Sequence, residues 1–444
     1  MAQFFKAAPK NSIKSRILKN VLVEKLDHQG RGIAFFQSKP LFIDGALQGE
    51  KLDVKITENK KRYSKATIMA VNQASDYRVS PTCPHYDQCG GCHLQHTSQE
   101  KQISIKQDGL LDLFSRFAKQ TPIELDAAIK SEPWGYRRSA RFGVQFNRKS
   151  KKVEMGFRRA LSNELIDQKV CPVLKAPLEV LIVPLKALLN SLNSKTDLGH
   201  IEMIWSDQGV VVLLRHLKAL PKNDIVLIEQ FSAQHHVNFF SQPTKSDLIC
   251  LSGESHLSYQ LAEWQSTLNF IATDFLQVNE IVNQKMVKQA LSWLELAKQD
   301  KVLDLFCGLG NFTLPIATQV DSVVGVEGVQ KMVDRASENA QFNEIDNATF
   351  FQADLSAEHL SKQVWANNHF NKVLLDPARA GALASIPFII SLKPSHVVYV
   401  SCDPVTLARD SQQLLENGYK LAKLGVLDMF PQTGHIESMA LFIK

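Results

Sequence analysis

Residues 302–312 read VLDLFCGLGNF, a short apolar run that leads directly into a glycine-rich turn. This pattern is typical of a buried strand followed by a loop that receives a cofactor in an open α/β sheet. From about residue 275 to the end of the chain, strand and helix patterns alternate regularly. The sequence therefore predicts a mostly parallel, doubly wound sheet in the C-terminal part.

Acidic residues follow three later apolar runs of the same part. Glu327 stands nearly twenty residues beyond the glycines, where a carboxylate suits both hydroxyls of a ribose. Asp354 is placed to suit an adenine amino group, and Asp376 ends the run 373–375. These acids predict a nucleoside-type cofactor, although the glycine motif alone would also fit NAD. The loop lacks the Gly-Lys-Ser/Thr ending of a phosphate cradle and resembles the first motif of S-adenosylmethionine-dependent methyltransferases.

A cysteine stands at the end of another apolar run. Cys402 follows residues 397–400 and precedes a turn at Asp403-Pro404, which predicts a thiol at the carboxyl edge of the sheet, in the cofactor crevice. A lone cysteine at a strand end is more often a core residue, but a cofactor loop in the same domain favours covalent group transfer. The motif DPAR at 376–379 argues against methylation of an adenine amino group.

Methyl transfer to a pyrimidine carbon requires activation of that carbon. A thiolate that adds to C6 makes C5 enolate-like, so that C5 accepts a methyl group from a sulfonium donor, and a base must then remove the C5 proton. We predict Cys402 as the nucleophile. Glu437, which precedes the last apolar run at 439–443, is the predicted base.

Residues 12–71 consist of short alternating runs separated by turn signals, among them Pro40, and predict a small closed β-barrel. Residues 1–70 hold 14 Lys/Arg against 6 Asp/Glu, and residues 130–169 hold 11 against 4, although the whole chain carries only +6. Two basic zones indicate a bound polyanion. Residues 134–142 interleave aromatics with arginines, which favours RNA binding by stacking and phosphate contacts. A purely structural barrel and a core strand with charged flanks are the alternatives.

Four of the seven cysteines form a group in which three lie close together and the fourth follows much later, before a proline: Cys83, Cys89, Cys92 and Cys171. Four thiolates suit either Zn²⁺ or an iron–sulfur cluster. A zinc ribbon more usually shows two close pairs, so the spacing favours a [4Fe–4S] cluster. Nearby histidines are alternative zinc ligands but are read as ordinary loop residues: His85, His93 and His96.

Taken together, these motifs resemble those of the bacterial RNA (uracil-C5) methyltransferases, and within them the enzymes of 23S ribosomal RNA that carry a TRAM barrel and a [4Fe–4S] cluster. The resemblance covers nearly the whole chain and implies that the four grouped cysteines hold the cluster and that Cys402 and Glu437 are nucleophile and base. It also implies a pocket for S-adenosylmethionine and the target base, lined by Gln277, Phe306, Asn311, Glu327, Asp354 and Asp376. In an alternative interpretation, Gln277 and Asp376 recognise the polar edges of the uracil instead of the cofactor. Phe275 is a candidate for stacking on the base.

Three domains are expected: a TRAM RNA-binding barrel at 12–71, a central α+β RNA-binding domain with the cluster at 72–265, and a Rossmann-like methyltransferase domain at 266–444. Periodicity predicts a helix near 97–118, and the resemblance implies that this helix packs on the catalytic domain. The expected partner is 23S ribosomal RNA, with no membrane and no obligate protein partner. Residues 1–6 lack the apolar core of a signal peptide, so a cytoplasmic enzyme is expected.

Two other functions stay open at this point. A transfer RNA uracil-C5 methyltransferase shares the catalytic motifs, but the barrel and the cysteine group weigh against it. A non-catalytic iron–sulfur RNA-binding protein is the second alternative, and it would need neither Cys402 nor Glu437.

Overall fold

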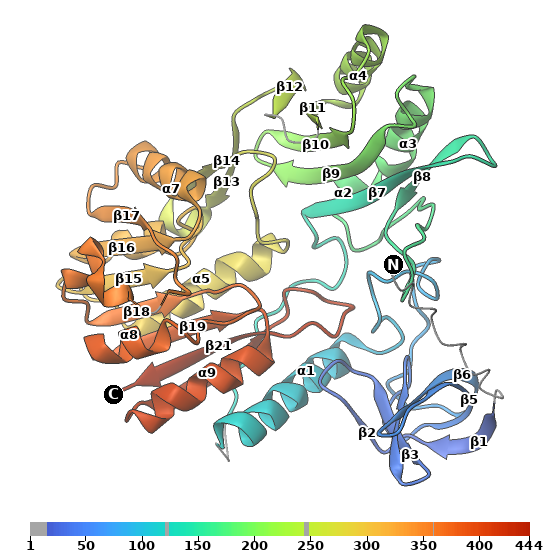
Figure 1. The fold of residues 1–444 in the computed structure, drawn as a ribbon, viewed down its shortest axis with the longest axis horizontal. Helices are drawn as coiled ribbons and strands as arrows, with labels where there is room; N and C mark the ends of the chain where they lie inside the picture. Colours follow the sequence, from blue (N-terminus) through green and yellow to red (C-terminus); the bar gives the residue numbers. More distant parts are fainter. Residues whose placement is uncertain (1–15, 120–123, 244–247, 358) are drawn as a thin grey trace, which may run out of the picture.

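The computed structural model describes residues 16–119, 124–243, 248–357 and 359–444. Residues 12–15 of the predicted barrel and the N-terminal residues 1–6 lie outside these ranges. The described chain forms a six-stranded N-terminal sheet, a six-stranded central sheet, a two-stranded ribbon and a seven-stranded C-terminal sheet (Figure 1). Within these ranges, none of the helices has the length and apolar character needed to cross a lipid bilayer.

The C-terminal sheet has the order β17-β16-β15-β18-β19-β21-β20. Its first five strands are parallel, and β21 runs antiparallel between β19 and β20. The predicted mostly parallel, doubly wound sheet is therefore confirmed. The strands are β15 Lys301–Leu305, β16 Ser322–Glu327, β17 Ala348–Gln352, β18 Lys372–Leu375, β19 His396–Ser401, β20 Lys420–Leu427 and β21 Glu437–Ile443.

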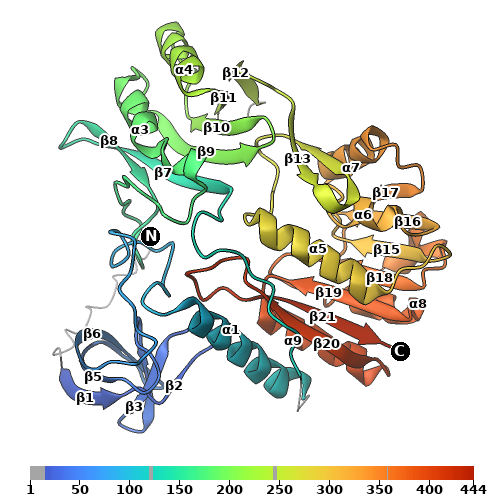
Figure 2. The same cartoon turned by 180° about the vertical axis from the view of Figure 1, so that it is seen from behind.

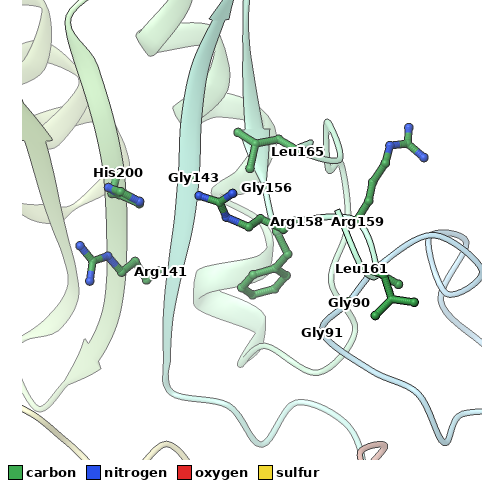
Figure 3. Close-up of a pocket in the computed structure, with 12 residues that line it drawn as sticks. Gly90, Gly91, Arg141, Gly143, Gly156, Arg158, Arg159, Leu161, Leu165 and His200 are labelled. Carbon is green, nitrogen blue, oxygen red and sulfur yellow. The ribbon is translucent and has the colours of Figure 1, made fainter. Parts of the chain in front are cut away.

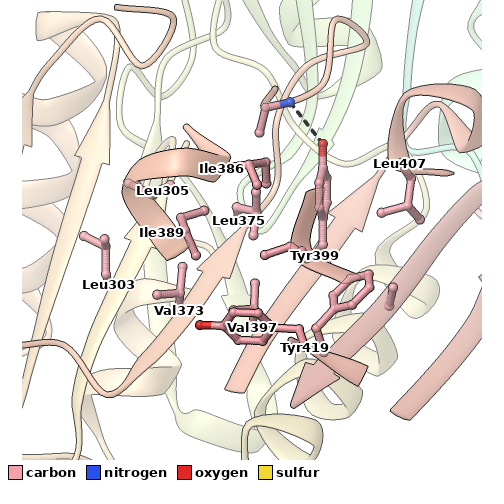
Figure 4. Packing of buried hydrophobic residues seen from close by; sticks show 14 of the residues in the cluster. Leu303, Leu305, Val373, Leu375, Ile386, Ile389, Val397, Tyr399, Leu407 and Tyr419 are labelled. Atoms are coloured by element: carbon pink, nitrogen blue, oxygen red, sulfur yellow. Dashed lines mark hydrogen bonds between the residues drawn. The ribbon is translucent and has the colours of Figure 1, made fainter. Parts of the chain in front are cut away.

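Helices cover both faces of this sheet, because alternate strand residues point to opposite sides. Leu303 and Leu375 pack in one cluster with α8, α9 and α1 (Figure 4), whereas Val302 and Leu374 pack in another with α5 and α6. The helices are α1 Gln99–Leu113, α5 Glu280–Leu294, α6 Thr313–Ala317, α7 Gln330–Phe342, α8 Ile386–Leu392 and α9 Pro404–Glu416. Burial of side chains on both faces explains why the strands read as continuous apolar runs.

Helix α1 precedes the central sheet in the chain but packs on the C-terminal sheet, beside α9 (Figure 2). Leu110, Leu113 and Phe114 are buried in the same cluster as residues of α9 and β20. The Ser98 hydroxyl caps the helix by accepting the Lys101 N–H, and a π-helical turn at Phe114–Ala118 extends it. The helix predicted near 97–118 is confirmed.

The N-terminal sheet is curled (Figure 1) and has the order β1-β5-β6-β4-β3-β2. Among the described residues its edge strands β1 and β2 do not pair with each other, so the predicted barrel, called the barrel below, is open between them rather than closed. Its strands are β1 Ile17–Leu22, β2 Lys25–Leu26, β3 Gly32–Phe36, β4 Lys39–Ile43, β5 Lys51–Asn59 and β6 Ser64–Gln73. Pro40, read from the sequence as a turn signal, lies inside β4, so that reading is wrong. The strand tolerates it because Pro40 has a neighbour on one side only: it pairs with Phe35 of β3, whereas β4 pairs with β6 only from Leu41 onward.

The central sheet has the order β12-β11-β10-β9-β7-β8 and carries helices α2, α3 and α4. Its elements are β7 Ser139–Asn147, β8 Lys152–Gly156, α2 Ala176–Glu179, α3 Ile182–Ser191, β9 Leu198–Ser206, β10 Gly209–His216, α4 Lys222–His235, β11 Val237–Pro243 and β12 Ile249–Ser252. The ribbon of β13 Leu257–Leu261 and β14 Ser266–Phe270 leads from this sheet to α5.

Candidate active site

Strand register brings the predicted nucleophile and base together. Ser401, at the end of β19, pairs with Ser438 near the start of the antiparallel strand β21. Cys402 follows Ser401 and Glu437 precedes Ser438, so both residues lie at the same edge of the sheet. Asp376 directly follows the neighbouring strand β18 and lies at that edge too.

Burial raises the pKa of all three groups, and like charges add to the effect at Cys402 and Glu437. Burial raises the pKa of the Cys402 thiol to about 11, with further contributions from the Glu437 and Asp376 carboxylates, while the Arg379 guanidinium acts in the opposite direction. Burial and then Asp376 raise the pKa of Glu437 to about 8. Burial alone raises the pKa of Asp376 to about 7. The thiol is therefore neutral at pH 7 and must lose its proton before it can attack.

A cavity of about 230 Å³ opens beside Cys402, and the N-terminal barrel forms part of its wall. His28 and Gln29, in the turn between β2 and β3, line it together with Arg379 and His435. Sequence reasoning missed His28 and Gln29, because no local pattern indicates which turn of the barrel reaches the catalytic sheet.

Backbone geometry at the end of β15 shapes the predicted cofactor loop. Phe306 has a φ of +64°, and Gly308 and Gly310 have φ values of +56° and +93°. A left-handed non-glycine residue at a strand end is a strained position of the kind found at ligand sites. The Glu327 carboxylate accepts the Gly308 N–H at 3.3 Å and the Val329 N–H at 3.1 Å, which fixes this acid beside the loop.

The other predicted pocket residues differ in how free their side chains are. Asp354 is exposed after β17, where its carboxylate accepts the N–H and hydroxyl of Ser356. The Asn311 amide is engaged in a reciprocal pair with Asn283, at 2.9 and 3.0 Å, and also accepts the Tyr259 hydroxyl at 3.2 Å.

Gln277 lies between β14 and α5, and its backbone carbonyl accepts a hydrogen bond from Arg138 Nε at 2.8 Å. Two residues before it, the Phe275 side chain is 72% exposed, so its ring is available to a ligand.

Cys83, Cys89, Cys92 and Cys171 line one cavity of about 430 Å³, which also contains Phe275 and His435. Burial is the largest cause of a raised pKa at each of these thiols, and the neighbouring thiols raise the pKa of three of them further. Over the ranges that the structure describes, no three His, Cys, Asp or Glu side chains are arranged to hold a metal ion. The metal ligand set therefore stays a prediction.

The nearby histidines have other partners. His96 Nδ1 is hydrogen bonded to the Tyr86 hydroxyl at 2.6 Å, and His93 Nε2 accepts the Gly434 N–H at 2.8 Å. The reading of these histidines as loop residues rather than metal ligands stays a prediction.

Comparison with known proteins places the chain in a family. The family model described as tRNA (Uracil-5-)-methyltransferase matches residues 98–444, and the TRAM domain model matches residues 18–69. The chain belongs to the tRNA (uracil-5-)-methyltransferase family and carries an N-terminal TRAM domain.

Two relatives match over the full length of this chain and carry the name 23S rRNA (uracil(1939)-C(5))-methyltransferase RlmD. The protein of Psychromonas ingrahamii is 65% identical over 100% of both chains. That of Photobacterium profundum is 47% identical over 100% of this chain and 97% of its own. The fold is also that of the Pyrococcus abyssi tRNA (uracil-54, C5)-methyltransferase, with a TM-score of 0.73 and 21% identity over 96% of this chain and 100% of that one.

Proposed function

We propose that this protein transfers a methyl group from S-adenosylmethionine to C5 of one uridine in 23S ribosomal RNA. The observation that carries the proposal is the meeting of Cys402 and Glu437 at the carboxyl edge of the sheet, next to the glycine-rich loop. The names of the full-length relatives support the RNA class. An enzyme of ribosomal RNA also belongs in the cytoplasm.

In the proposed reaction, Cys402 first loses its proton to bulk water, and Glu437 takes part in its ionised form. Its thiolate then adds to C6 of the uracil, and the electron pair displaced onto C5 takes the methyl group from the sulfonium donor, which leaves as a neutral thioether. Glu437 removes the C5 proton, the C5–C6 double bond reforms, and the Cys402 thiolate departs. The raised pKa of Glu437 suits a group that must take up a proton near neutral pH.

Six residues are proposed for the pocket that holds the methyl donor and the uracil: Gln277, Phe306, Asn311, Glu327, Asp354 and Asp376. Glu327 and Asp354 retain acceptor capacity for hydroxyl and amino groups, since each carboxylate oxygen has two lone pairs. Asn311 acts differently in this proposal: because Asn283 and Tyr259 occupy its amide, it supports the loop.

We further propose that the four grouped cysteines hold a [4Fe–4S] cluster. Four thiols around one cavity fit a polynuclear cluster better than a single ion, on which all ligands must converge. The cluster would supply a rigid cross-link between the cysteine loop, residues 83–92, and the segment before α2. Iron and acid-labile sulfide, measured on anaerobically purified protein, test this assignment, and stoichiometric zinc in a colourless protein would overturn it.

Methyl mapping tests the function. We expect 23S ribosomal RNA from cells without this gene to lack one 5-methyluridine, which the intact gene restores and a Cys402→Ala gene does not. Restoration by the Cys402→Ala gene would exclude the covalent mechanism. Unchanged 23S ribosomal RNA would exclude the proposed substrate and direct the same mapping to transfer RNA.

A further inference from the structure

A cavity of about 630 Å³ lies on the central sheet, beside the cysteine loop (Figure 3). We call it the arginine pocket and define it by Arg141, Arg158, Arg159 and His200, with Gly90 and Gly91 of the cysteine loop. In Figure 3, Arg158 extends over β7 toward Arg141 and His200, whereas Arg159 points outward. Of these residues, only Arg141 belongs to the segment 134–142 that the sequence predicts to contact RNA.

The arginine pocket is positively charged. Arg158 donates to the side chain and carbonyl of Asn163, at 2.8 and 3.2 Å, and across the described residues no carboxylate forms an ion pair with it. Arg141 shares the single carboxylate of Glu202 with Arg215, at 3.5 and 3.0 Å. None of the described residues that line the pocket is acidic. An anion is therefore the ligand that these walls favour.

The backbone of the cysteine loop holds the arginines in place. The Gly90 N–H donates to the Arg158 carbonyl at 3.0 Å, and the Ala160 N–H donates to the Gln88 carbonyl at 2.9 Å. A Cβ atom on Gly90 would lie 3.2 Å from the Arg158 carbonyl oxygen, so a larger residue would push the two segments apart. The pairing of these two segments thus fixes the backbone from which Arg158 and Arg159 extend.

Shared lining residues connect this pocket to Cys402 through two further cavities. Arg141 also lines a cavity of about 290 Å³. Arg137 and Phe275 belong both to that cavity and to the cysteine cavity. Arg379 and His435 belong both to the cysteine cavity and to the cavity beside Cys402. An arginine therefore stands at every junction along the path.

We propose that the arginine pocket binds backbone phosphates of the substrate RNA on one side of the target uridine, and that the strand passes the arginines at these junctions outside the cysteine cavity, which the proposed cluster fills. The inference rests on the proposed function and names a second contact with the same substrate. Arginines at successive junctions match the repeated charge of a nucleic-acid backbone better than a lone small anion. The strand must be unpaired here, because the uridine leaves its stack to reach Cys402.

The test measures the affinity of Arg141→Gln and Arg158→Gln proteins for nested 23S ribosomal RNA fragments that are shortened from either end around the methylated uridine. Arg148→Gln, in the exposed turn between β7 and β8, removes the same charge outside the pocket. We expect each pocket variant to bind long RNA about tenfold more weakly. We also expect the slope of log affinity against log salt to fall by about one.

Both effects should vanish once the RNA is shortened from one particular end. The inference is overturned if Arg158→Gln and Arg148→Gln behave alike, or if the defect persists on the shortest fragment.

Methyl transfer by the unmodified protein on the same RNA separates this inference from the proposed function. Absence of transfer by that protein refutes the function. If transfer is normal, we expect Arg158→Gln to raise KM about tenfold and to leave kcat unchanged, because the contact is equal in the ground and transition states. An unchanged KM would refute the second contact alone.

Discussion

Glu437 carries its carboxyl in a buried position beside Cys402 and Asp376, where a negative charge is costly. Burial and Asp376 raise the pKa of Glu437, so its protonated form dominates below about pH 8. A carboxyl with this pKa ionises as the pH rises through about 8, and the ionised form is the one that can accept the C5 proton. The same environment raises the pKa of the Cys402 thiol to about 11.

Replacement of Glu437 by Gln should separate methyl transfer from release. The amide occupies the same space but accepts no proton, so C5 is methylated and the RNA stays bound to Cys402. Denaturing electrophoresis should show a protein–RNA adduct that carries radiolabel from the methyl donor. Glu338→Gln, on the exposed face of α7, serves as the control and should show none. Normal turnover by the Glu437→Gln protein would remove this residue as the base.

Asp376→Asn should move the pH dependence of methyl transfer. The log of kcat should rise with pH as Glu437 loses its proton near pH 8. Removal of the Asp376 charge lowers the pKa of both Glu437 and Cys402, so the rise should shift toward lower pH, whatever happens to the maximal rate. Burial is the larger cause and remains, so the shift stays small. Asp354→Asn, at another strand end, should leave the midpoint in place, and an upward shift in Asp376→Asn would contradict this account.

Among the elements, α1 is attached to the catalytic sheet by a buried ion pair as well as by apolar contacts. Lys106 Nζ lies 2.6 Å from Asp428 Oδ1, both side chains are fully buried, and the same ammonium donates to the Phe430 carbonyl at 3.0 Å. Asp428 directly follows β20, and the loop after it leads to Glu437. The pair therefore positions the segment that carries the proposed base.

Lys106→Met should destabilise the protein by about 3–5 kcal/mol, because the Asp428 carboxylate is left buried without its partner. The double variant Lys106→Met/Asp428→Leu should recover most of this loss, since two apolar side chains replace the pair. Urea unfolding followed by tryptophan fluorescence measures both. Equal losses in the single and double variants would show that the two charges are not coupled.

Strand ends were predictable from the sequence, because apolar runs followed by Gly, Asp or Pro define them locally. This placed Cys402, Asp376 and Glu327 correctly at one edge of the sheet. The direction of the Asn311 amide was not predictable, since it depends on Asn283, 28 positions away. Pro40 was misread because its tolerance depends on which positions of β4 have a second neighbour.

In the whole molecule, the barrel turn at His28 and Gln29 meets the loop before Glu437, a contact between segments some four hundred residues apart that no sequence pattern indicates. A Cβ atom on Gly434 would lie 2.1 Å from the Gln29 carbonyl oxygen. The barrel therefore fits closely against the catalytic loop and completes the cavity beside Cys402.

Gly434→Ala should force this contact apart and lower methyl transfer at least tenfold, because the loop that leads to Glu437 must shift. Gly199→Ala is the matched control, since a Cβ there meets only the Arg215 carbonyl oxygen at an ordinary 3.6 Å. Hydrogen exchange of the Gly434→Ala protein should show faster exchange around residues 27–31 and 430–436, with the rest of the barrel unchanged. Normal activity in this variant would show that the fit is not needed.

The placement of α1 also determines when the enzyme becomes active during its own synthesis. Gln102 and Gln432, 330 positions apart, bond to each other across the contact between this helix and the catalytic loop. The helix emerges from the ribosome well before β20 and β21, which follow it in the chain, and cannot pack on them until they are made. A protein proposed to modify ribosomal RNA thus acquires its base, and with it the ability to act, only after the ribosome has made β21.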